Sequence, residues 1–586
     1  MKRVFLNING VKNFFKKYYF ILIIILAIIV KLIITTNLPL NARDPIGADE
    51  YLMMQQAESL ANGEYLGPYN FLTLVKGIGF PVFLAFSYKI GIPLLMLYGI
   101  FYVAACLVAL VPIRRLIQKK PLQLIAFLML LFCPATLDGS VQLIYRNMLI
   151  VPQSVLLVSS LMMMYYHVLD NNRKKLLGWT LLTSFAWIFM WHTREDSIWS
   201  VPLMGLAWVI MLIMIIKGVK SKIFTKKFWA RKDNKKILTK FGIISLPFLL
   251  LFVSIHIISF INYQNYGVYT TNQLNNSNYT KAVMLMMKIK PEKEVERVEI
   301  TRETLRRLYG VSPTLKTLEK EIEKDYENKT GLVMAGDDNG EINEDLITWE
   351  LIGSASVVGY YKDAQTAEKF WNNVYQEIKQ AIDDGKLETR PILPSRSLIP
   401  WPGKQDSFAK LFESIGSLYI RLADYNDSKV NLDKATIDES IIRRYENISG
   451  GHAIRATDPA IVEENGARWV GYVNKIRKIY GLISPILFLI GILYYIGFTV
   501  FMIIKSIKKE TCYFDRWIFL SATLGGLTVM LVGLGYVNAF MVNVYGYITS
   551  SGGLFNLFIT LTTVLLIQDA IDFMPHIVSR WHKLHP

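Results

Sequence analysis

Long apolar runs alternate with short charged connections over most of this 586-residue chain. A helix needs about 20 mostly apolar residues to cross the hydrocarbon core of a bilayer, and ten stretches reach or approach that length. The pattern therefore predicts a polytopic α-helical membrane protein with about ten spanning helices. The predicted spans lie near residues 18–38, 92–112, 121–137, 148–168, 176–191, 197–216, 241–261, 478–503, 516–537 and 552–572.

One long segment, 262–475, interrupts the apolar pattern. It carries four of the twelve tryptophans and helical charge patterning near 364–383, which is typical of a folded domain rather than of a linker. We expect this insert to be a helical or α+β domain. The chain then divides into an N-terminal membrane module over 1–261, with a first outer loop at 38–91, the insert, and a C-terminal group of spans over 476–586.

The basic residues indicate the orientation of the chain in the membrane. The net charge is +17, yet segment 262–475 holds 28 Lys+Arg against 33 Asp+Glu, whereas the rest holds 36 against 14. The basic excess lies in short connections beside apolar runs, which is the positive-inside pattern. A nucleic-acid site would instead cluster basic residues on a soluble face, so no nucleic-acid partner is expected. We expect a multi-pass plasma-membrane protein with both termini cytoplasmic and the insert extracellular.

The first outer loop concentrates candidate chemistry beside the membrane. Its acidic residues are Asp44, Asp49 and Glu50. A helix-like run over 51–60 follows and ends at an Asn-Gly pair. Lys76 then precedes an apolar segment, 77–88, which glycine and proline interrupt. This segment favours a helix lying in the membrane interface over a span.

The order of these motifs resembles the GT-C superfamily of polyprenyl-phosphate-dependent membrane glycosyltransferases, and within it the protein mannosyltransferases and aminoarabinose transferases. The likeness rests on Asp49-Glu50-Tyr51 in the first outer loop and on Lys-Gly-x-x-x-Pro from Lys76 onward. It covers roughly residues 19–217 together with the topology. The resemblance implies a GT-C-like fold, a lipid-linked donor of the undecaprenyl-phosphate type, and an acidic catalytic base in the first outer loop.

The resemblance makes Asp49 the general base. An acceptor hydroxyl is a poor nucleophile until a carboxylate takes its proton. Glu50 or Asp44 would assist, and Asp49 with Glu50 is the pair that would hold a divalent cation if one is required. The alternative is that these carboxylates only solvate the loop or cap the helix that follows.

A donor phosphate needs cations at the outer interface. The candidates on the predicted topology are Lys76, Arg146, His192 and Arg194. Lys76 matches a lysine that the resemblance places near the donor phosphate. Each basic side chain could instead reach lipid headgroups, and Arg194 could pair with an acidic neighbour in the sequence.

Three classes of function fit the sequence. The first is an enzyme that moves a sugar or a preassembled glycan from a polyprenyl-(pyro)phosphate carrier to an envelope glycolipid or polysaccharide, which includes a ligase that attaches teichoic acid-type chains to a glycolipid anchor. The second is a transporter or flippase of lipid-linked glycan, and the third is a sensor or scaffold. Transporters often carry internal repeats and midplane charges. The sequence has no evident repeat, and only Lys31 lies deep in a predicted span, which favours the transferase.

Overall fold

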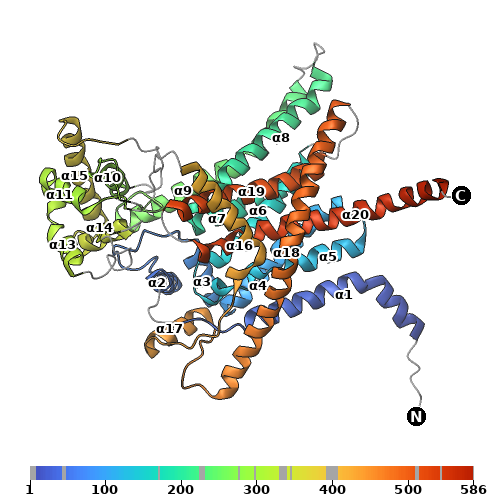
Figure 1. The fold of residues 1–586 in the computed structure, drawn as a ribbon, viewed down its shortest axis with the longest axis horizontal. Helices are drawn as coiled ribbons and strands as arrows, with labels where there is room; N and C mark the ends of the chain where they lie inside the picture. The colour runs from blue at the N-terminus through green and yellow to red at the C-terminus, as the bar shows by residue number, and fades with distance from the viewer. Residues whose placement is uncertain are drawn as a thin grey trace.

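The computed structural model describes residues 8–42, 48–168, 172–223, 231–274, 277–295, 298–328, 340–342, 346–390, 407–508, 514–540 and 544–584. In these ranges the regular structure is helical, and three isolated β-bridges link extended segments. Figure 1 shows a bundle of long helices with a smaller helical lobe beside one end of it.

Every predicted apolar stretch falls on a helix. These helices are α1 (Ile8–Thr36), α4 (Leu94–Leu116), α5 (Lys120–Leu131), α6 (Asn147–His167), α7 (Arg173–Thr193), α8 (Ser200–Ile223), α9 (Arg231–Tyr266), α18 (Ala460–Ile507), α19 (Phe514–Phe540) and α20 (Gly552–Leu584). Among the described residues, eight helices are long and apolar enough to cross a membrane, or nine if one bent pair counts as a single span. The chain is therefore a multi-pass membrane protein.

Two of the predicted spans do not meet this criterion as single helices, and each has a physical reason. The stretch 121–137 is bent by 49°, because α5 ends at Leu131 and the turn η1 (Pro134–Thr136) starts with a proline that cannot continue the helix. Helix α7 has the length of a span, but basic residues at its start and hydroxyl side chains along it make it less apolar.

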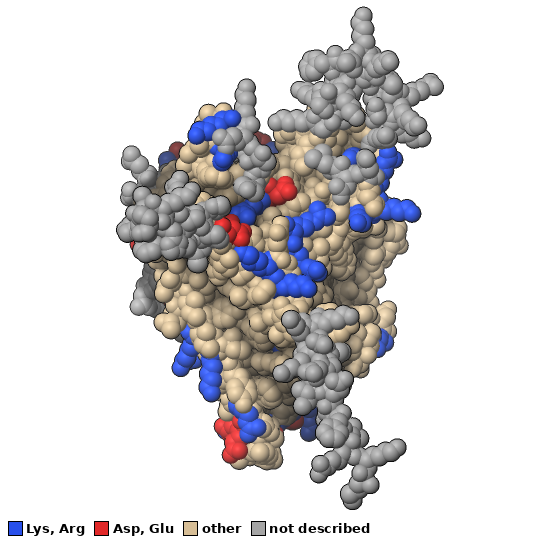
Figure 2. All heavy atoms as spheres, turned by 90° about the vertical axis from the view of Figure 1, so that its right-hand side faces the viewer, with Lys and Arg blue, Asp and Glu red and all other residues tan. Residues whose placement is uncertain are grey.

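The bundle has one basic end, which lies opposite the lobe. Helix α4 ends there with Arg115, whose guanidinium lies 3.2 Å from the ring of His167 at the end of α6. Lys119 pairs with Asp572 at 2.6 Å on the same side. Figure 2 views this end, where Lys and Arg prevail over Asp and Glu on the described surface. Its assignment to the cytoplasm remains a prediction from the charge pattern.

Six helices of the insert form the lobe around a core of their own. They are α10 (Asn278–Met287), α11 (Arg302–Val311), α12 (Pro313–Lys316), α13 (Glu319–Asn328), α14 (Leu346–Val357) and α15 (Ala364–Asp383). Trp371 is 1% exposed at the centre of this core, where its indole N–H donates to Tyr361 at 2.9 Å and its ring packs edge-on against Tyr279.

Two further helices of the insert pack elsewhere. Helix α16 (Ser407–Asp424) lies against α18 and α19, and helix α17 (Glu439–Ser449) packs on α2 and α3 of the first outer loop. The predicted insert limits, 262 and 475, fall inside α9 and α18. The insert therefore contributes helices to the lobe, to the bundle and to the surface of the first outer loop.

The first outer loop holds the two short helices that the sequence indicates. The run over 51–60 lies within α2 (Ala48–Asn62), which ends before Gly63 at a left-handed φ of 84°. The apolar segment 77–88 forms α3 (Gly79–Lys89), whose 11 residues are too few to span a bilayer.

We predict that Lys31→Met raises the thermal stability of the protein. The Lys31 side chain is fully buried, donates to Thr136 Oγ1 at 2.7 Å and lies 5.3 Å from the Tyr102 ring centroid, and it makes no ion pair within the described residues. Burial of an unpaired charge is costly, so methionine should stabilise the fold by about 1 kcal/mol or more.

The measurement is the midpoint of thermal unfolding in detergent. Lys119→Met is the control, because that exposed ion pair at the basic end should change stability by less than about 1 kcal/mol. A lower midpoint for Lys31→Met would contradict the argument.

Candidate functional site

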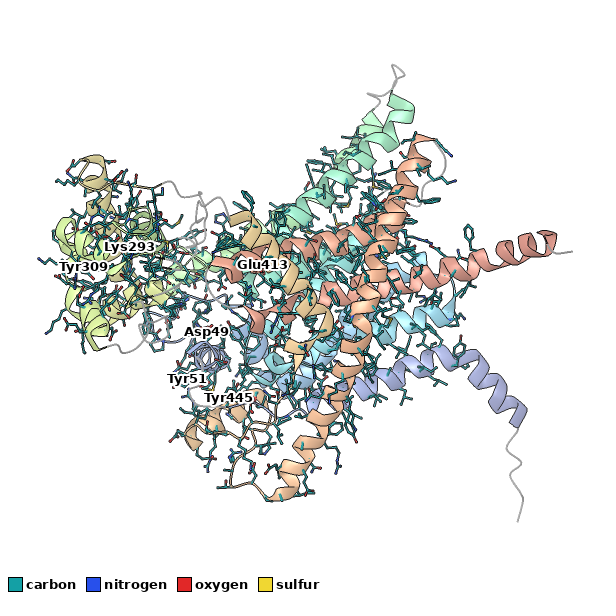
Figure 3. All side chains as sticks on the ribbon, in the orientation of Figure 1. Asp49, Tyr51, Lys293, Tyr309, Glu413 and Tyr445 are labelled. Carbon is teal, nitrogen blue, oxygen red and sulfur yellow. The ribbon has the colours of Figure 1, made fainter. Side chains whose placement is uncertain are left out.

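Asp49 lies where α2, the bundle and the lobe come together. It belongs to the first turn of α2, where a carboxylate is favoured by the positive end of the helix dipole. Figure 3 shows Asp49 on α2, between the lobe and the bundle. The site is thus at the end of the bundle opposite the basic end.

One oxygen of Asp49 carries both of its polar contacts. Lys76 Nζ lies 3.0 Å from Asp49 Oδ2, and the hydroxyl of Tyr145 donates to that same oxygen at 3.0 Å. Oδ1 accepts no hydrogen bond within the described residues. The Asp49 side chain is 31% exposed, so the carboxylate is partly accessible.

Lys76 is largely buried although its side chain is ionisable. Its side chain is 10% exposed, and Nζ lies 5.3 Å from the ring centroid of Trp349, which comes from α14 of the lobe. Burial and the nearby charge of Arg146 lower the pKa of Lys76, whereas Asp49 and Glu195 act in the opposite direction. An additional anion beside Lys76 would favour its charged form.

Arg146 forms an ion pair with Glu195 behind Lys76. One guanidinium nitrogen lies 2.7 and 2.6 Å from the two carboxylate oxygens of Glu195. The same carboxylate accepts the backbone N–H of Gly77 at 3.2 Å and the Asn272 amide at 3.1 Å. Burial acts to raise the pKa of Glu195, but the charges of Arg146 and Lys76 outweigh it and lower that pKa. Glu195 therefore stays ionised and links four segments.

Two glycines allow the Lys76 segment to approach the end of α7. A Cβ atom on Gly77 would lie 2.3 Å from the backbone oxygen of His192, and one on Gly79 would lie 2.8 Å from it. Both distances are shorter than real Cβ contacts. The Lys-Gly-x-x-x-Pro pattern thus has a packing reason in this fold, because a larger residue would push Lys76 away from Asp49.

The other predicted site residues take different positions. The His192 ring lies 3.0 Å from the hydroxyl of Ser254 on α9, so its polar contact is made within the bundle. Arg194 donates to the side-chain oxygen of Asn147 at the start of α6. Glu50 lies close enough to α17 for its charge to add to the effect of burial, which raises the pKa of Tyr445. Asp44 lies outside the described residues.

Four residues of this site were not predicted as site residues. Tyr145 directly precedes Arg146, and Glu195 directly follows Arg194, so each adjoins a predicted cation. Asn272 and Trp349 belong to the insert and contact Glu195 and Lys76 across long sequence separations. No local pattern could have identified those two contacts.

The described residues around Asp49 do not build a metal site. Nowhere in the described ranges do three His, Cys, Asp or Glu side chains gather in a way that could hold a metal ion. The ammonium of Lys76 and the phenol of Tyr145 both contact Oδ2 of Asp49.

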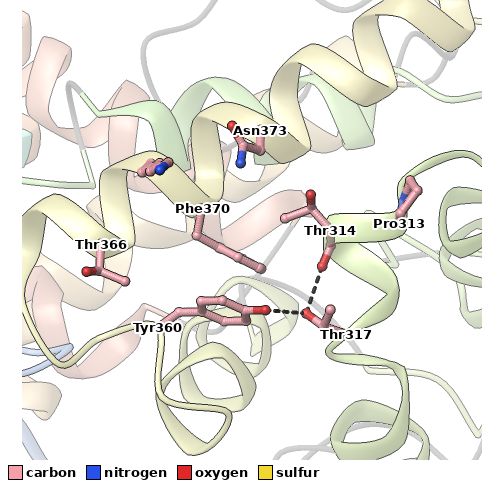
Figure 4. A pocket seen from close by; sticks show the side chains of 8 residues that line it. Pro313, Thr314, Thr317, Tyr360, Thr366, Phe370 and Asn373 are labelled. Atoms are coloured by element: carbon pink, nitrogen blue, oxygen red, sulfur yellow. Dashed lines mark hydrogen bonds between the residues drawn. The ribbon is translucent and has the colours of Figure 1, made fainter.

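A separate hollow of about 410 Å³ opens on the lobe (Figure 4). Its lining consists of Pro313, Thr314, Thr317, Tyr360, Thr366, Lys369, Phe370 and Asn373. None of these side chains is a carboxylate, so the hollow offers no general base of the kind that Asp49 provides.

Comparison with known proteins adds little to this site. No family model and no curated protein matches the sequence. Two solved structures of ArnT from Cupriavidus metallidurans align over 96% of this chain and 81% of their own. The structure bound to undecaprenyl phosphate has 11% identity and a TM-score of 0.27, and the apo structure has 12% and 0.29. Similarity this low assigns no family, so the residues of the site carry the functional argument.

We predict that Glu195→Gln destabilises the protein by about 3 kcal/mol or more, because it leaves the buried charge of Arg146 without its partner. The double variant Arg146→Gln, Glu195→Gln should recover part of this loss. Thermal or chemical unfolding of the native protein, of the single variants Glu195→Gln and Arg146→Gln and of the double variant measures the coupling, and additive losses would show that the pair is not coupled.

The same pair predicts a pH dependence. The pKa of Glu195 is lower in the folded protein than its ordinary value. Its stabilisation is therefore complete above the ordinary carboxyl pKa and is lost as the pH falls through the lowered pKa. The stability difference between the native protein and Glu195→Gln should shrink in acid, which unfolding measured at a series of pH values can test.

Proposed function

We propose that this protein is a GT-C-type membrane glycosyltransferase that uses a polyprenyl-phosphate-linked donor and a hydroxyl acceptor of the cell envelope. The observation that carries the proposal is the geometry of Asp49. One of its oxygens is held by Lys76 and Tyr145, the other accepts no hydrogen bond within the described residues, and the side chain is 31% exposed beside the largely buried Lys76. The sequence resemblance independently makes Asp49 the base and Lys76 a phosphate ligand.

The proposed reaction is a displacement at the sugar C1 atom. Asp49 Oδ1 takes the proton of the acceptor hydroxyl, and the acceptor oxygen forms a new bond to C1. The bond between C1 and the phosphate oxygen breaks, and the phosphate leaves with the bonding electron pair. Lys76 and Tyr145 hold Oδ2, so they fix the orientation of the carboxylate during proton transfer.

Two cations fit the departing phosphate. Lys76 is the first, because a phosphate beside it would offset the cost of keeping a buried ammonium charged. Arg146 is the second. Its Nη1 donates to Glu195. Its buried Nε has no hydrogen-bond partner, so this N–H could donate a charge-assisted hydrogen bond to an anion.

The unit transferred is either a single sugar or a preassembled chain, as in a ligase that attaches teichoic acid to a glycolipid anchor. Both use the same chemistry at Asp49. Lipid-linked intermediates of a strain that lacks the gene distinguish the two, since a ligase defect accumulates long lipid-linked chains and a single-sugar defect leaves the chains without one sugar.

We expect Asp49→Asn to reduce transfer by about 10²- to 10⁴-fold, which is the usual contribution of a general base. The asparagine keeps the size of the side chain, so the protein should remain folded and membrane-inserted. The measurement is the envelope glycan profile of a deletion strain that expresses the variant, together with thermal unfolding of the purified protein.

The matched control is Glu58→Gln on the same helix. Glu58 pairs with Arg444 at 2.5 Å, away from Asp49, and its loss should leave transfer nearly unchanged. Full activity of Asp49→Asn would refute the assignment of the base.

We expect Lys76→Met to raise the KM for the lipid-linked donor by about tenfold or more, because a charge-assisted hydrogen bond to the phosphate is lost. Lys76→Arg should restore part of the affinity. Lys290→Met removes an exposed lysine of the insert that pairs with Glu388 and should leave the KM unaltered. An unchanged donor KM in Lys76→Met would contradict the phosphate-binding role.

A further inference from the structure

Helix α16 belongs to the insert by sequence but to the bundle by packing. Leu418 and Leu422 are at most 2% exposed and join the same apolar core as the spanning helices. The hydroxyl of Tyr419 lies 2.7 Å from that of Thr528, which is in the middle of α19, and its ring stacks at 5.5 Å on Phe488 of α18. The inner face of α16 therefore lies along the apolar part of two spans.

The outer face of α16 carries an apolar stripe, next to the exposed charged residues Lys410 and Glu413. Phe412 and Ile420 are each 70% exposed. They are eight residues apart, which places them on the same side of a helix, with the exposed Ala409 and Gly416 on the same stripe. Burying a side chain such as Phe or Ile is worth about 1.5–3 kcal/mol, so a stripe of this kind in water would be unfavourable.

Helix α15 of the same insert provides an internal comparison. It has one buried apolar face, like α16, but its exposed positions are all polar or charged. These positions are Gln365, Lys369, Asn373, Gln376, Lys379, Gln380 and Asp383. The lobe thus follows the rule for a helix in water, whereas α16 departs from it.

Helix α16 packs against α18, which also carries exposed apolar residues. Leu482, Ile486 and Leu489 of α18 are 60–76% exposed and lie on the same helix as Phe488, on which Tyr419 stacks. These α18 residues lie in a helix long and apolar enough to cross a membrane, where exposed leucine and isoleucine contact lipid. The position of α16 therefore makes its outer face a continuation of that lipid-facing surface. Glu413, beside Phe412, lies on α16 next to the bundle (Figure 3).

We propose that α16 lies within the membrane leaflet on the lobe side of the bundle, with Phe412 and Ile420 in contact with lipid acyl chains. An amphipathic helix in this position buries apolar side chains among the acyl chains and keeps charged ones at headgroup depth. This proposal does not depend on the transferase function.

The test is site-directed spin labelling of the full-length protein in nanodiscs of phosphatidylethanolamine and phosphatidylglycerol. Phe412→Cys and Ile420→Cys are labelled one at a time after Cys512 is replaced by serine, because Cys106 and Cys133 are buried. Val357→Cys is the matched control, since Val357 is 71% exposed at the end of α14 in the lobe. Accessibility to oxygen, which concentrates in lipid, is compared with accessibility to a water-soluble nickel chelate.

We expect labels at 412 and 420 to collide several-fold more often with oxygen than with the chelate, and the label at 357 to show the reverse. Chelate accessibility at 412 or 420 equal to that at 357 would overturn the proposal, because the stripe would then be in water and require a protein partner. If either substitution prevents folding, Ala409→Cys and Gly416→Cys test the same stripe, and a Cβ at Gly416 meets no atom within 4 Å.

Discussion

The ion pair between Arg146 and Glu195 is the interaction on which the end of the bundle depends. Glu195 follows α7 and binds Arg146 before α6, the Gly77 amide of the first outer loop and the Asn272 side chain of the insert. A charged pair out of water is stable only when its remaining polar atoms are satisfied, so these segments must meet in one arrangement. Lys76 is adjacent to Gly77, and the position of Lys76 beside Asp49 follows from this network.

Much of the fold could be predicted from hydrophobicity, because a bilayer imposes a length and a composition on each span. Where the prediction was incomplete, a local feature competes with the apolar pattern. Pro134 interrupts the stretch 121–137, which its apolar composition alone predicts to be one continuous span. Helix α16 lies in the insert by sequence, and its packing on Phe488 and Thr528 associates it with the membrane core.

The site was predictable in part. Asp49 and Lys76 are 27 residues apart, and their ion pair agrees with the motif order that the resemblance supplied. The partners that shape their chemistry could not be inferred in the same way. Tyr145 reaches Asp49 across 96 residues and Asn272 reaches Glu195 across 77, and a single sequence has no signal for such contacts. His192, predicted for its position beside Arg194, has its ring nitrogen 3.0 Å from the Ser254 hydroxyl, another contact between segments distant in the sequence.

The insert takes part in the electrostatics of the site. Trp349 lies over the ammonium of Lys76, so the lobe limits the access of water to this charge. Burial and Arg146 lower the pKa of Lys76, and Asp49 and Glu195 oppose them. A donor phosphate would add to the opposing anions and raise that pKa. By linkage, protonation of Lys76 must then strengthen phosphate binding by the same factor. Because Lys76 also pairs with Asp49, donor binding and the position of the Asp49 carboxylate both depend on this one lysine.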